Sequence, residues 1–373
     1  MTKLLFFIDT TLSSGGAEKV LQTLVNHLDP SRFDVTVMTA WPEDATHRFL
    51  PHIHYKSLYP ARNKLWRLIS RAEAQLGLTY RLRMAGDYDI EIAYLEHGPT
   101  KILASSTNAR AKKLAWVHCE LDKSESDLSE LQRKASGWYA KFDRVLCVSQ
   151  TVRDSFIRIF GNKPEALVLH NVVDSDEILT KAAQSLPESL GKRRLTVATV
   201  GRMYPPKGYD HLLQVHKQLK EDGVDHDLWI LGDGPERGSL EAYCREHHLE
   251  DSVSMPGYLT NPYPVFREAD VIVCSSRYEG FSTVVTEALI LGKPVVTTDC
   301  SGMYELLGNN EFGIITENSV SGLYAGLKRM LSEPGLMDRY AAAAALRGKD
   351  FCRDVLVGKH EAFFTELLEG TSL

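Results

Sequence analysis

The feature that most constrains the fold of this chain is the alternation of short apolar strands with helical segments along its whole length. Such alternation is typical of parallel sheets that are covered by helices on both faces. Twelve apolar runs predict the strands, in order "LLFFID", "DVTVMT", "DIEIAYL", "KLAWVH", "RVLCVS", "ALVLHNVV", "LTVATVG", "DLWILGDG", "SVSMPGY", "DVIVCSS", "PVVTTD" and "FGIIT". The stretch from Asp174 to Arg194 divides them into two series, is polar, and is expected to be a linker. We therefore expect an α/β protein of two Rossmann-like domains that face each other across a cleft.

Size and composition agree with this expectation and exclude several other classes. The chain has 373 residues, which exceeds a usual single core, and it contains no run of about 18 apolar residues that could span a membrane. Its first apolar run is too short for the core of a signal peptide, so a cytoplasmic location is expected. The six cysteines are scattered without a C-x-x-C pair, which predicts reduced thiols rather than a disulfide framework or a metal site.

Two D-x-D patterns, from Asp87 to Asp89 and from Asp225 to Asp227, have the carboxylate spacing of some metal sites. Both precede a predicted strand. Because ligands of open parallel sheets bind at the carboxyl ends of the strands, these carboxylates stand at the wrong end. We predict no metal site.

A basic amphipathic segment runs from Ala61 to Arg83, with six Lys or Arg, one Glu, and several Leu and a Trp at helical spacing. Such a helix can lie on an anionic membrane surface. It can equally be an ordinary solvated helix that packs its Leu and Trp side chains on its own domain, and the pattern does not decide between these two.

Adjacent glycines, Gly15 and Gly16, follow the first predicted strand and precede a helix. Glycine suits a backbone that takes positive φ or that approaches a ligand closely, and the amides of a helix N-terminus attract phosphate. A tight turn without a ligand is the other interpretation, and this pair of residues alone does not exclude it.

The loop "GRMYPPKGYD" places Arg202 and Lys207 after the first strand of the second series. Two cations on a loop stiffened by two prolines can neutralise a diphosphate, Arg in bidentate fashion and Lys as a point charge. Further along, "YEGFSTVVTE" places Glu279 on a loop and Glu287 in the second turn of the next helix. Carboxylates at a cleft can accept hydrogen bonds from the hydroxyls of a ribose or a sugar, although a surface Glu and a salt-bridged Glu remain the alternative.

Taken together, these motifs resemble the retaining GT-B glycosyltransferases of the large family 4 group. The resemblance covers essentially the whole chain and depends on the N-terminal "GG", on "GRMYPPKG", on "GDGPER", and on the E-x7-E pattern followed by "GKPVVTTD". It implies a GT-B fold of three segments: an acceptor-binding domain over residues 1–175, a nucleotide-sugar domain over 176–354, and a helix over 355–373 that returns toward the first domain.

The resemblance also implies roles for particular residues. Arg202 and Lys207 would grip the donor diphosphate, Glu287 would bind the ribose, and Glu279 would hold hydroxyls of the transferred sugar near its anomeric carbon. His118 would face the transfer site. The remaining donor-site residues would be Gly15, Gly16, Gly257, Tyr258, Leu259, Gly280, Phe281, Ser282, Thr283 and Val284. Of these, Gly16 would close onto the diphosphate from the other domain, and Gly257, Tyr258 and Leu259 would contact the base. Ser282 departs from the family's usual glycine, which puts the identity of the sugar in doubt.

The implied activity is transfer of a hexose or N-acetylhexosamine from a UDP-sugar to an acceptor hydroxyl, with retention and without a metal. A same-face displacement is expected, because no carboxylate is placed as a nucleophile. The favoured acceptor is a membrane lipid-linked glycan in cell-surface polysaccharide synthesis, and no nucleic-acid partner is expected. Two alternatives stay open: a nucleotide-sugar epimerase or phosphorylase on the same scaffold, and a degenerate GT-B protein that steadies another glycosyltransferase.

Overall fold

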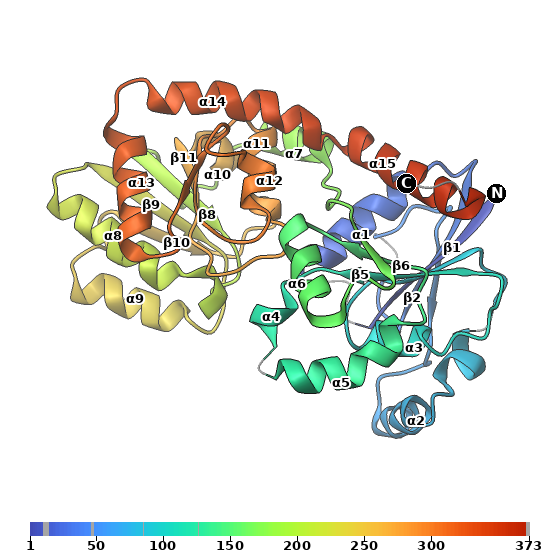
Figure 1. Ribbon diagram of the computed structural model, residues 1–373. Helices are drawn as coiled ribbons and strands as arrows, with labels where there is room; N and C mark the ends of the chain where they lie inside the picture. The colour runs from blue at the N-terminus through green and yellow to red at the C-terminus, as the bar shows by residue number, and fades with distance from the viewer. Residues whose placement is uncertain (10–14, 46–47, 85, 126, 371–373) are drawn as a thin grey trace. The chain divides into compact units, whose positions relative to one another are not determined.

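The structure is a computed structural model that describes residues 1–9, 15–45, 48–84, 86–125 and 127–370. The chain divides into two compact units, one formed by Met1–Val172 with Asp354–Leu373 and the other by Val173–Arg353. The sequence placed these divisions at residues 175/176 and 354/355, within three residues of the observed ones. Each unit is described by itself below (Figure 1).

The first unit is built on a seven-stranded parallel sheet of order β3-β2-β1-β4-β5-β6-β7. Its strands are β1 (Thr2–Ile8), β2 (Phe33–Thr39), β3 (His54–Ser57), β4 (Ile90–Ala93), β5 (Lys112–Val117), β6 (Arg144–Cys147) and β7 (Glu165–Val168). Its helices are α1 (Gly16–His27), α2 (Lys64–Gln75), a π-helical turn η1 (Tyr80–Met84), α3 (Gly98–Leu103), α4 (Leu121–Ser124), α5 (Leu128–Tyr139), α6 (Gln150–Phe160) and α15 (Arg353–Glu369). All strands predicted in this half are present. The additional strand β3 has a polar sequence at the sheet edge, so it lacks the apolar run by which the others were recognised.

The C-terminal helix α15 packs on the first unit. Phe364 contacts the rings of Phe6 and Phe33 with centroids 6.2 Å apart in both cases, and His360 stacks on Trp116 at 5.6 Å. Arg32 also pairs with Glu361 at 2.7 Å. These contacts explain why the last residues of the chain belong to the unit that contains its first strand.

The second unit has a six-stranded parallel sheet of order β10-β9-β8-β11-β12-β13. Its strands are β8 (Leu195–Val200), β9 (His226–Leu231), β10 (Val253–Gly257), β11 (Val271–Cys274), β12 (Val295–Thr298) and β13 (Ile314–Thr316). Its helices are α7 (Ser175–Ala182), η2 (Pro205–Lys207), α8 (Tyr209–Glu221), α9 (Arg237–Glu246), α10 (Tyr263–Glu268), α11 (Thr283–Ile290), α12 (Met303–Leu307), α13 (Val320–Ser332), α14 (Leu336–Arg347) and η3 (Gly348–Phe351). The strand order reverses between β8 and β11, which is where open sheets of this kind bind ligands.

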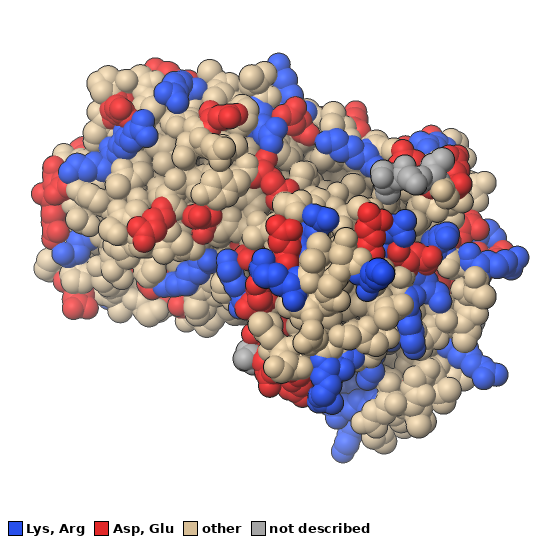
Figure 2. Space-filling view, in the orientation of Figure 1, with Lys and Arg blue, Asp and Glu red and all other residues tan. Residues whose placement is uncertain are grey.

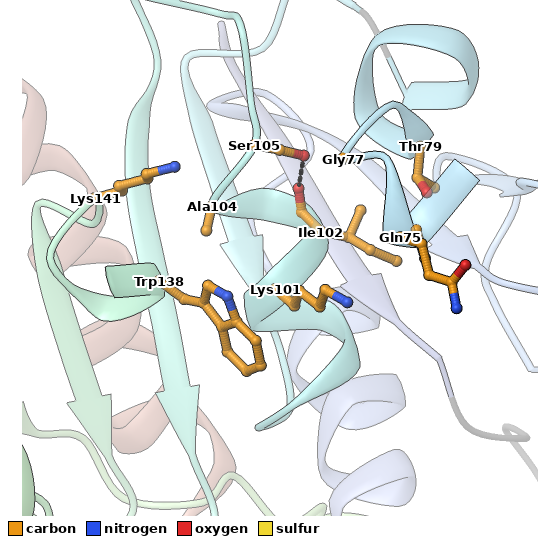
Figure 3. A pocket seen from close by; sticks show the side chains of 10 residues that line it. Gln75, Gly77, Thr79, Lys101, Ile102, Ala104, Ser105, Trp138 and Lys141 are labelled. Carbon is orange, nitrogen blue, oxygen red and sulfur yellow. Dashed lines mark hydrogen bonds between the residues drawn. The ribbon is translucent and has the colours of Figure 1, made fainter. Parts of the chain in front are cut away.

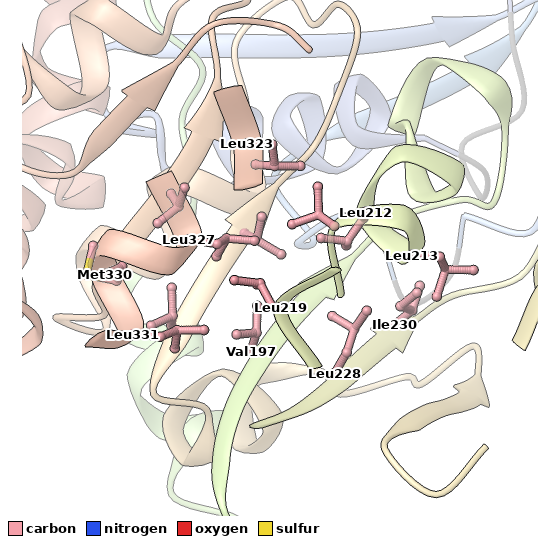
Figure 4. Packing of buried hydrophobic residues seen from close by; sticks show 14 of the residues in the cluster. Val197, Leu212, Leu213, Leu219, Leu228, Ile230, Leu323, Leu327, Met330 and Leu331 are labelled. Carbon is pink, nitrogen blue, oxygen red and sulfur yellow. The ribbon is translucent and has the colours of Figure 1, made fainter. Parts of the chain in front are cut away.

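The core of the second unit lies between its sheet and helices α8 and α13. Leucine and valine side chains from these elements interdigitate, as Figure 4 shows for Leu212, Leu219, Leu228, Leu323 and Leu327. The apolar spacing that predicted these helices is therefore the spacing of the face that they bury.

One prediction about organisation is wrong. The stretch from Asp174 to Arg194 is not a linker throughout, because its first part forms α7, which packs on the second unit. Ile178 and Ala182 are buried there with Val173 and Tyr263. Helix α7 itself contributes only Ile178 and Ala182 to this buried cluster, which is why no long apolar stripe marks the helix in the sequence. Among the described residues, no helix is long and apolar enough to cross a bilayer.

Candidate active site

Two loops at the carboxyl ends of β8 and β11 are joined by hydrogen bonds. The hydroxyl of Ser275 donates to the carbonyl of Lys207 at 2.8 Å, and the backbone amide of Arg277 donates to the carbonyl of Pro206 at 2.7 Å. Gly208 lies between them at φ 63°, and a Cβ on it would come within 2.2 Å of the Ser275 carbonyl oxygen. Glycine is therefore required at residue 208 both by the backbone conformation and by the close approach of the two loops.

The joined loops bring Lys207 and Glu279 into contact. The Lys207 ammonium lies 2.6 Å from Oε1 of Glu279, with the two side chains 27% and 14% exposed. The hydroxyl of Ser276 donates to the same carboxylate oxygen at 2.7 Å. Desolvation lowers the pKa of Lys207, but the neighbouring Glu279 charge outweighs it and the pKa lies above its usual value. Lys207 is therefore charged at neutral pH, and Glu279 is held by two donors.

Arg202 lies on the same loop but does not join this pair. Its guanidinium carbon is 5.4 Å from the centroid of the Tyr204 ring, and the residue is exposed. A third cation, Arg277 on the loop after β11, was not recognised from the sequence. It pairs with Asp210 at 2.7 Å and so fastens the end of β11 to the start of α8.

The N-terminus of α11 follows Glu279 by four residues. Ser282 caps the helix, because its hydroxyl accepts the amide of Val285 at 3.4 Å. The preceding amides, of Thr283 and Val284, then have no acceptor within the helix and can bind an anion. The φ of Ser282, −72°, is available to any residue, so a serine at this position causes no backbone strain. Phe281 is buried against Phe351, so only its backbone can contact a ligand.

Glu287 is nearly buried on the second turn of α11. The hydroxyl of Tyr263, also buried, donates to its Oε1 at 3.1 Å. Sequence reasoning considered a salt-bridged Glu at this position and missed the tyrosine, which is 24 residues away and carries no motif. Burial, followed by the Glu287 charge, raises the pKa of Tyr263, so the phenol keeps the proton that it donates.

Gly257 ends β10 at φ 87°, and its carbonyl accepts the amide of Gly232 at the end of β9. The next residue, Tyr258, is largely exposed. The predicted base-contacting segment, which continues to Leu259, thus lies at the same end of the sheet as Lys207 and Glu279.

Gly15, Gly16 and His118 belong to the first unit. Gly15 caps α1 in an extended conformation (φ −144°), so neither glycine of the pair is needed for positive φ. A Cβ on Gly15 would instead come within 2.0 Å of the Glu18 carboxylate, whereas the space beside Gly16 is open. A side chain at Gly15 would therefore displace the flexible Glu18 carboxylate, and one at Gly16 would meet no protein atom. The two serines that precede the pair lie outside the described residues.

His118 follows β5 and is packed among aromatic rings. Its ring centroid is 4.7 Å from that of Tyr94 and 5.9 Å from that of Trp116. Burial lowers its pKa, partly opposed by Glu96, whose carboxylate accepts the backbone amides of His118 and Cys119. Both ring nitrogens are buried and make no hydrogen bond of ordinary geometry within the described residues. Buried ring nitrogens without such a hydrogen bond are able to accept a ligand or a water as partner.

The D-x-D carboxylates are occupied by cations. Arg194 contacts Asp225 at 2.6 Å and Asp227 at 3.0 Å, and Asp87 contacts Lys3 and Arg110, both at 3.2 Å. Within the described residues, no group of three or more His, Cys, Asp or Glu side chains is arranged to hold a metal ion, and the six cysteines are unbridged.

Two Rossmann-like units, with a Lys–Glu pair and a helix N-terminus at the switch point of the second sheet, define a glycosyltransferase of the GT-B class. Residues 14–177 match the family model described as Glycosyltransferase Family 4, and residues 182–347 match the one described as Glycosyl transferases group 1. The chain belongs to this family and is a glycosyltransferase, an enzyme that moves a sugar from a nucleotide-sugar donor to a glycan acceptor.

Known relatives cover nearly the whole chain. The N-acetylgalactosamine-N,N'-diacetylbacillosaminyl-diphospho-undecaprenol 4-alpha-N-acetylgalactosaminyltransferase of Campylobacter jejuni is 29% identical over 362 residues, which are 94% of this chain and 96% of the relative. The structure of Anabaena HepE in complex with UDP and glucose is 18% identical with a TM-score of 0.76, covering 98% and 100% of the two chains. Sucrose-phosphate synthase from Thermosynechococcus elongatus is 15% identical with a TM-score of 0.79, covering 100% of both. At these identities the two solved structures show the fold alone.

Proposed function

We propose that the protein is a retaining, metal-independent glycosyltransferase that moves a hexose or N-acetylhexosamine from a UDP-sugar to a hydroxyl of a lipid-linked glycan. The observation that carries this proposal is the contact between Lys207, on the loop after β8, and Glu279, on the loop after β11. Glu279 precedes the first residue of α11 by four positions. A cation, a carboxylate and unsatisfied amides at one switch point suit a donor that has a diphosphate next to a sugar.

The diphosphate needs charge stabilisation as the glycosidic bond breaks. Lys207 is charged and held by its loop, and the exposed guanidinium of Arg202 is available for bidentate binding. The amides of Thr283 and Val284 add fixed dipoles. Preorganised groups of this kind stabilise developing negative charge without a metal ion.

The two glutamates suit the hydroxyls of the donor. Glu287, oriented by Tyr263, would accept hydrogen bonds from the ribose, and Glu279 from the transferred sugar. Gly257, Tyr258 and Leu259 would contact the uracil. HepE was solved with UDP and glucose, which supports a uridine donor on this fold.

Retention without a covalent intermediate is supported by the surroundings of Glu279. Its Oε1 receives donors from both Lys207 and Ser276, which lowers its nucleophilicity. We infer a same-face displacement in which the departing phosphate oxygen takes the acceptor proton. In the first unit, neutral His118 would hold a sugar hydroxyl and Gly16 would approach the diphosphate. Detection of a glycosylated Glu279 peptide by mass spectrometry would contradict this mechanism.

A lipid-linked acceptor would be met at the cytoplasmic face of a membrane. The name of the Campylobacter jejuni relative describes a transfer to a diphospho-undecaprenol-linked sugar. The basic segment over residues 61–83 fits an enzyme that works at such a surface, in the synthesis of a cell-surface polysaccharide.

The direct test is release of nucleoside diphosphate from a panel of UDP-, GDP- and ADP-sugars in the absence of acceptor. We expect slow release from a UDP-sugar, lost in Arg202→Ala and in Glu287→Ala but kept in Arg245→Ala, an exposed arginine on α9 that makes no ion pair among the described residues. No release from any donor, together with no donor-dependent rise in melting temperature, would instead favour a degenerate GT-B partner protein.

A further inference from the structure

Helix α2 presents two separate apolar faces, of which its own domain covers one. On the covered face, the ring of Trp66 lies 6.2 Å from that of Tyr59, and the Arg83 guanidinium lies over both rings. Arg83 also pairs with Glu73 at 2.6 Å. We call Tyr59, Trp66, Glu73 and Arg83 the inward cluster. Glu73 is the only acidic residue between residues 61 and 83, and its charge is balanced by Arg83.

The other face of α2 carries leucines that are largely exposed among the residues that the structure describes. Leu65, Leu68 and Leu76 are 61%, 67% and 71% exposed. With Ala72 they stand at positions i, i+3, i+7 and i+11, so they align on one side of the helix over roughly 16 Å. Leu78 and Leu82, just beyond the helix, are also exposed. We name Leu65, Leu68 and the C-cap residue Leu76 the leucine stripe.

Cations border the leucine stripe. Lys64, Arg67 and Arg71 are spaced by three and four residues and so form a parallel row on the next face of the helix. Arg62 precedes the helix and Arg81 lies on the turn η1 that follows it, and none of the five makes an ion pair with any residue that the structure describes. In Figure 2 the surface over α2, at the lower right, is mainly tan with blue atoms at its edge. An apolar stripe beside cations without ion pairs matches a lipid bilayer with anionic headgroups, because the acyl chains can contact the leucines and the headgroups can contact the cations.

A hollow of about 190 Å³ opens where the leucine stripe ends. Gln75 and Gly77, on either side of Leu76 in the sequence, line it together with Lys101, Trp138 and Lys141 (Figure 3). The Lys101 ammonium lies 6.0 Å from the centroid of the Trp138 indole. Neither lysine pairs with a carboxylate in the described part of the chain. The hollow therefore presents two free cations and an aromatic ring, which suit a phosphate-bearing group.

We propose that α2 lies flat on an anionic lipid bilayer, with the leucine stripe between the headgroups, Lys64, Arg67 and Arg71 on their phosphates, and the hollow filled by one phosphate-bearing headgroup. A bilayer fits better than a protein partner, because the cations form a continuous row along the stripe rather than isolated charges with matching geometry. The proposal deepens the membrane location given above, but the binding that it describes requires no catalysis.

Co-sedimentation with lipid vesicles tests whether α2 binds an anionic bilayer. Vesicles of phosphatidylglycerol and phosphatidylcholine are compared with vesicles of phosphatidylcholine alone, at low and high salt. We expect the protein to bind the anionic vesicles at least tenfold more tightly and to lose most of this binding at high salt. Equal binding to the two vesicle types, or no binding to either, would overturn the proposal.

Variants separate the contributions. Replacing Leu65, Leu68 and Leu76 by Gln, or Lys64, Arg67 and Arg71 by Gln, should weaken binding at least tenfold. Two matched controls should bind as the parent does: Leu179→Gln with Leu346→Gln, two exposed leucines elsewhere, and Arg245→Gln with Lys349→Gln and Lys359→Gln, three exposed cations elsewhere. Undiminished binding by the leucine variant would contradict insertion of the stripe.

Replacement of Lys101 and Lys141 by Gln should weaken binding severalfold, and parental affinity in that variant would remove the hollow from the docking surface. All variants should keep the melting temperature and the acceptor-free donor hydrolysis of the parent, so a failure of docking is distinguishable from a failure of the proposed activity. If sedimentation without vesicles showed a dimer that the leucine variant abolishes, the stripe would be an interface between two copies and not a membrane surface.

Discussion

The ammonium of Lys207 lies 2.6 Å from Oε1 of Glu279, so the charge of this partly buried cation is already balanced by a carboxylate of the candidate donor site. A donor diphosphate must therefore share Lys207 with the carboxylate. This relationship links the group that would bind phosphate to the group that would bind the sugar, because moving one side chain moves the other.

Replacement of Lys207 by Met removes one of the two donors to Glu279 Oε1 and leaves the Ser276 hydroxyl. It also removes the positive charge that would stabilise the donor diphosphate. We expect kcat/KM for transfer to fall by a factor of about 100 or more, equivalent to about 3 kcal/mol of transition-state stabilisation. Initial rates with a UDP-sugar check this. Lys207→Arg keeps the charge and should retain more activity, and equal losses in both variants would argue that packing rather than charge is responsible.

Replacement of Tyr263 by Phe removes the hydroxyl that orients Glu287 and keeps the ring in its apolar cluster. Loss of one hydrogen bond to a carboxylate is worth about 1–2 kcal/mol, so KM for the donor should rise roughly five- to thirtyfold with a smaller change in kcat. Tyr340→Phe is the matched control, since it removes a buried hydroxyl that donates to the Asn310 carbonyl elsewhere in the same unit. A KM unchanged by Tyr263→Phe would show that Glu287 does not depend on this tyrosine.

The stability of the first unit should fall in acid because of His360. Burial lowers its pKa from the ordinary 6.5 to about 4, so between these values the unfolded state binds a proton that the folded state does not. Stability is therefore lost as the pH falls from 6.5 toward 4, by about 2 kcal/mol between pH 7 and pH 5. Urea unfolding at the two pH values should show a smaller loss in His360→Phe, which keeps an aromatic ring against Trp116.

His27→Phe is the comparison for that experiment. His27 makes the same contact with a carbonyl four residues earlier, at 2.8 Å, but from a partly exposed position. If both replacements reduced the acid sensitivity equally, the burial of His360 would not be its cause.

Arg353, the last residue of the second unit, is bound to the first turn of α7. Its guanidinium contacts Asp174 at 3.1 Å and Asp176 at 2.6 Å, and its backbone amide donates to the Ser175 hydroxyl at 3.2 Å. Arg353→Gln should lower the free energy of unfolding by about 1–3 kcal/mol, because Asp174 is left partly buried without its cation. Arg329→Gln, which breaks an exposed pair with Glu333, should change it by less than about 1 kcal/mol. Urea unfolding measures the free energy of unfolding of both variants. Equal losses would show that the Arg353 contacts stabilise the protein no more than an exposed ion pair does.

The apolar runs that predicted twelve strands are strands of the two sheets, because a parallel strand covered by helices on both faces is mainly apolar. Strand β3 and helix α7 were not predicted, because each buries few apolar side chains and so has no apolar run in the sequence. Ser282 was interpreted through its difference from a family glycine, whereas its backbone is unstrained and its hydroxyl caps a helix.

The sequence by itself determined that two series of strands form two α/β units, and that Arg202, Lys207, Glu279 and Glu287 follow strand ends where a ligand can bind. These properties follow from local periodicity and from residue order. Only the tertiary structure decided which side chains are in contact. Ser276 and Lys207 donate to Glu279, Tyr263 donates to Glu287, and Arg353 pairs with Asp174. It also decided that the leucine stripe lies on the exposed side of α2. Most of these contacts join residues far apart in the chain, and which face of a helix is covered depends on the rest of the domain, so neither leaves a local pattern in the sequence.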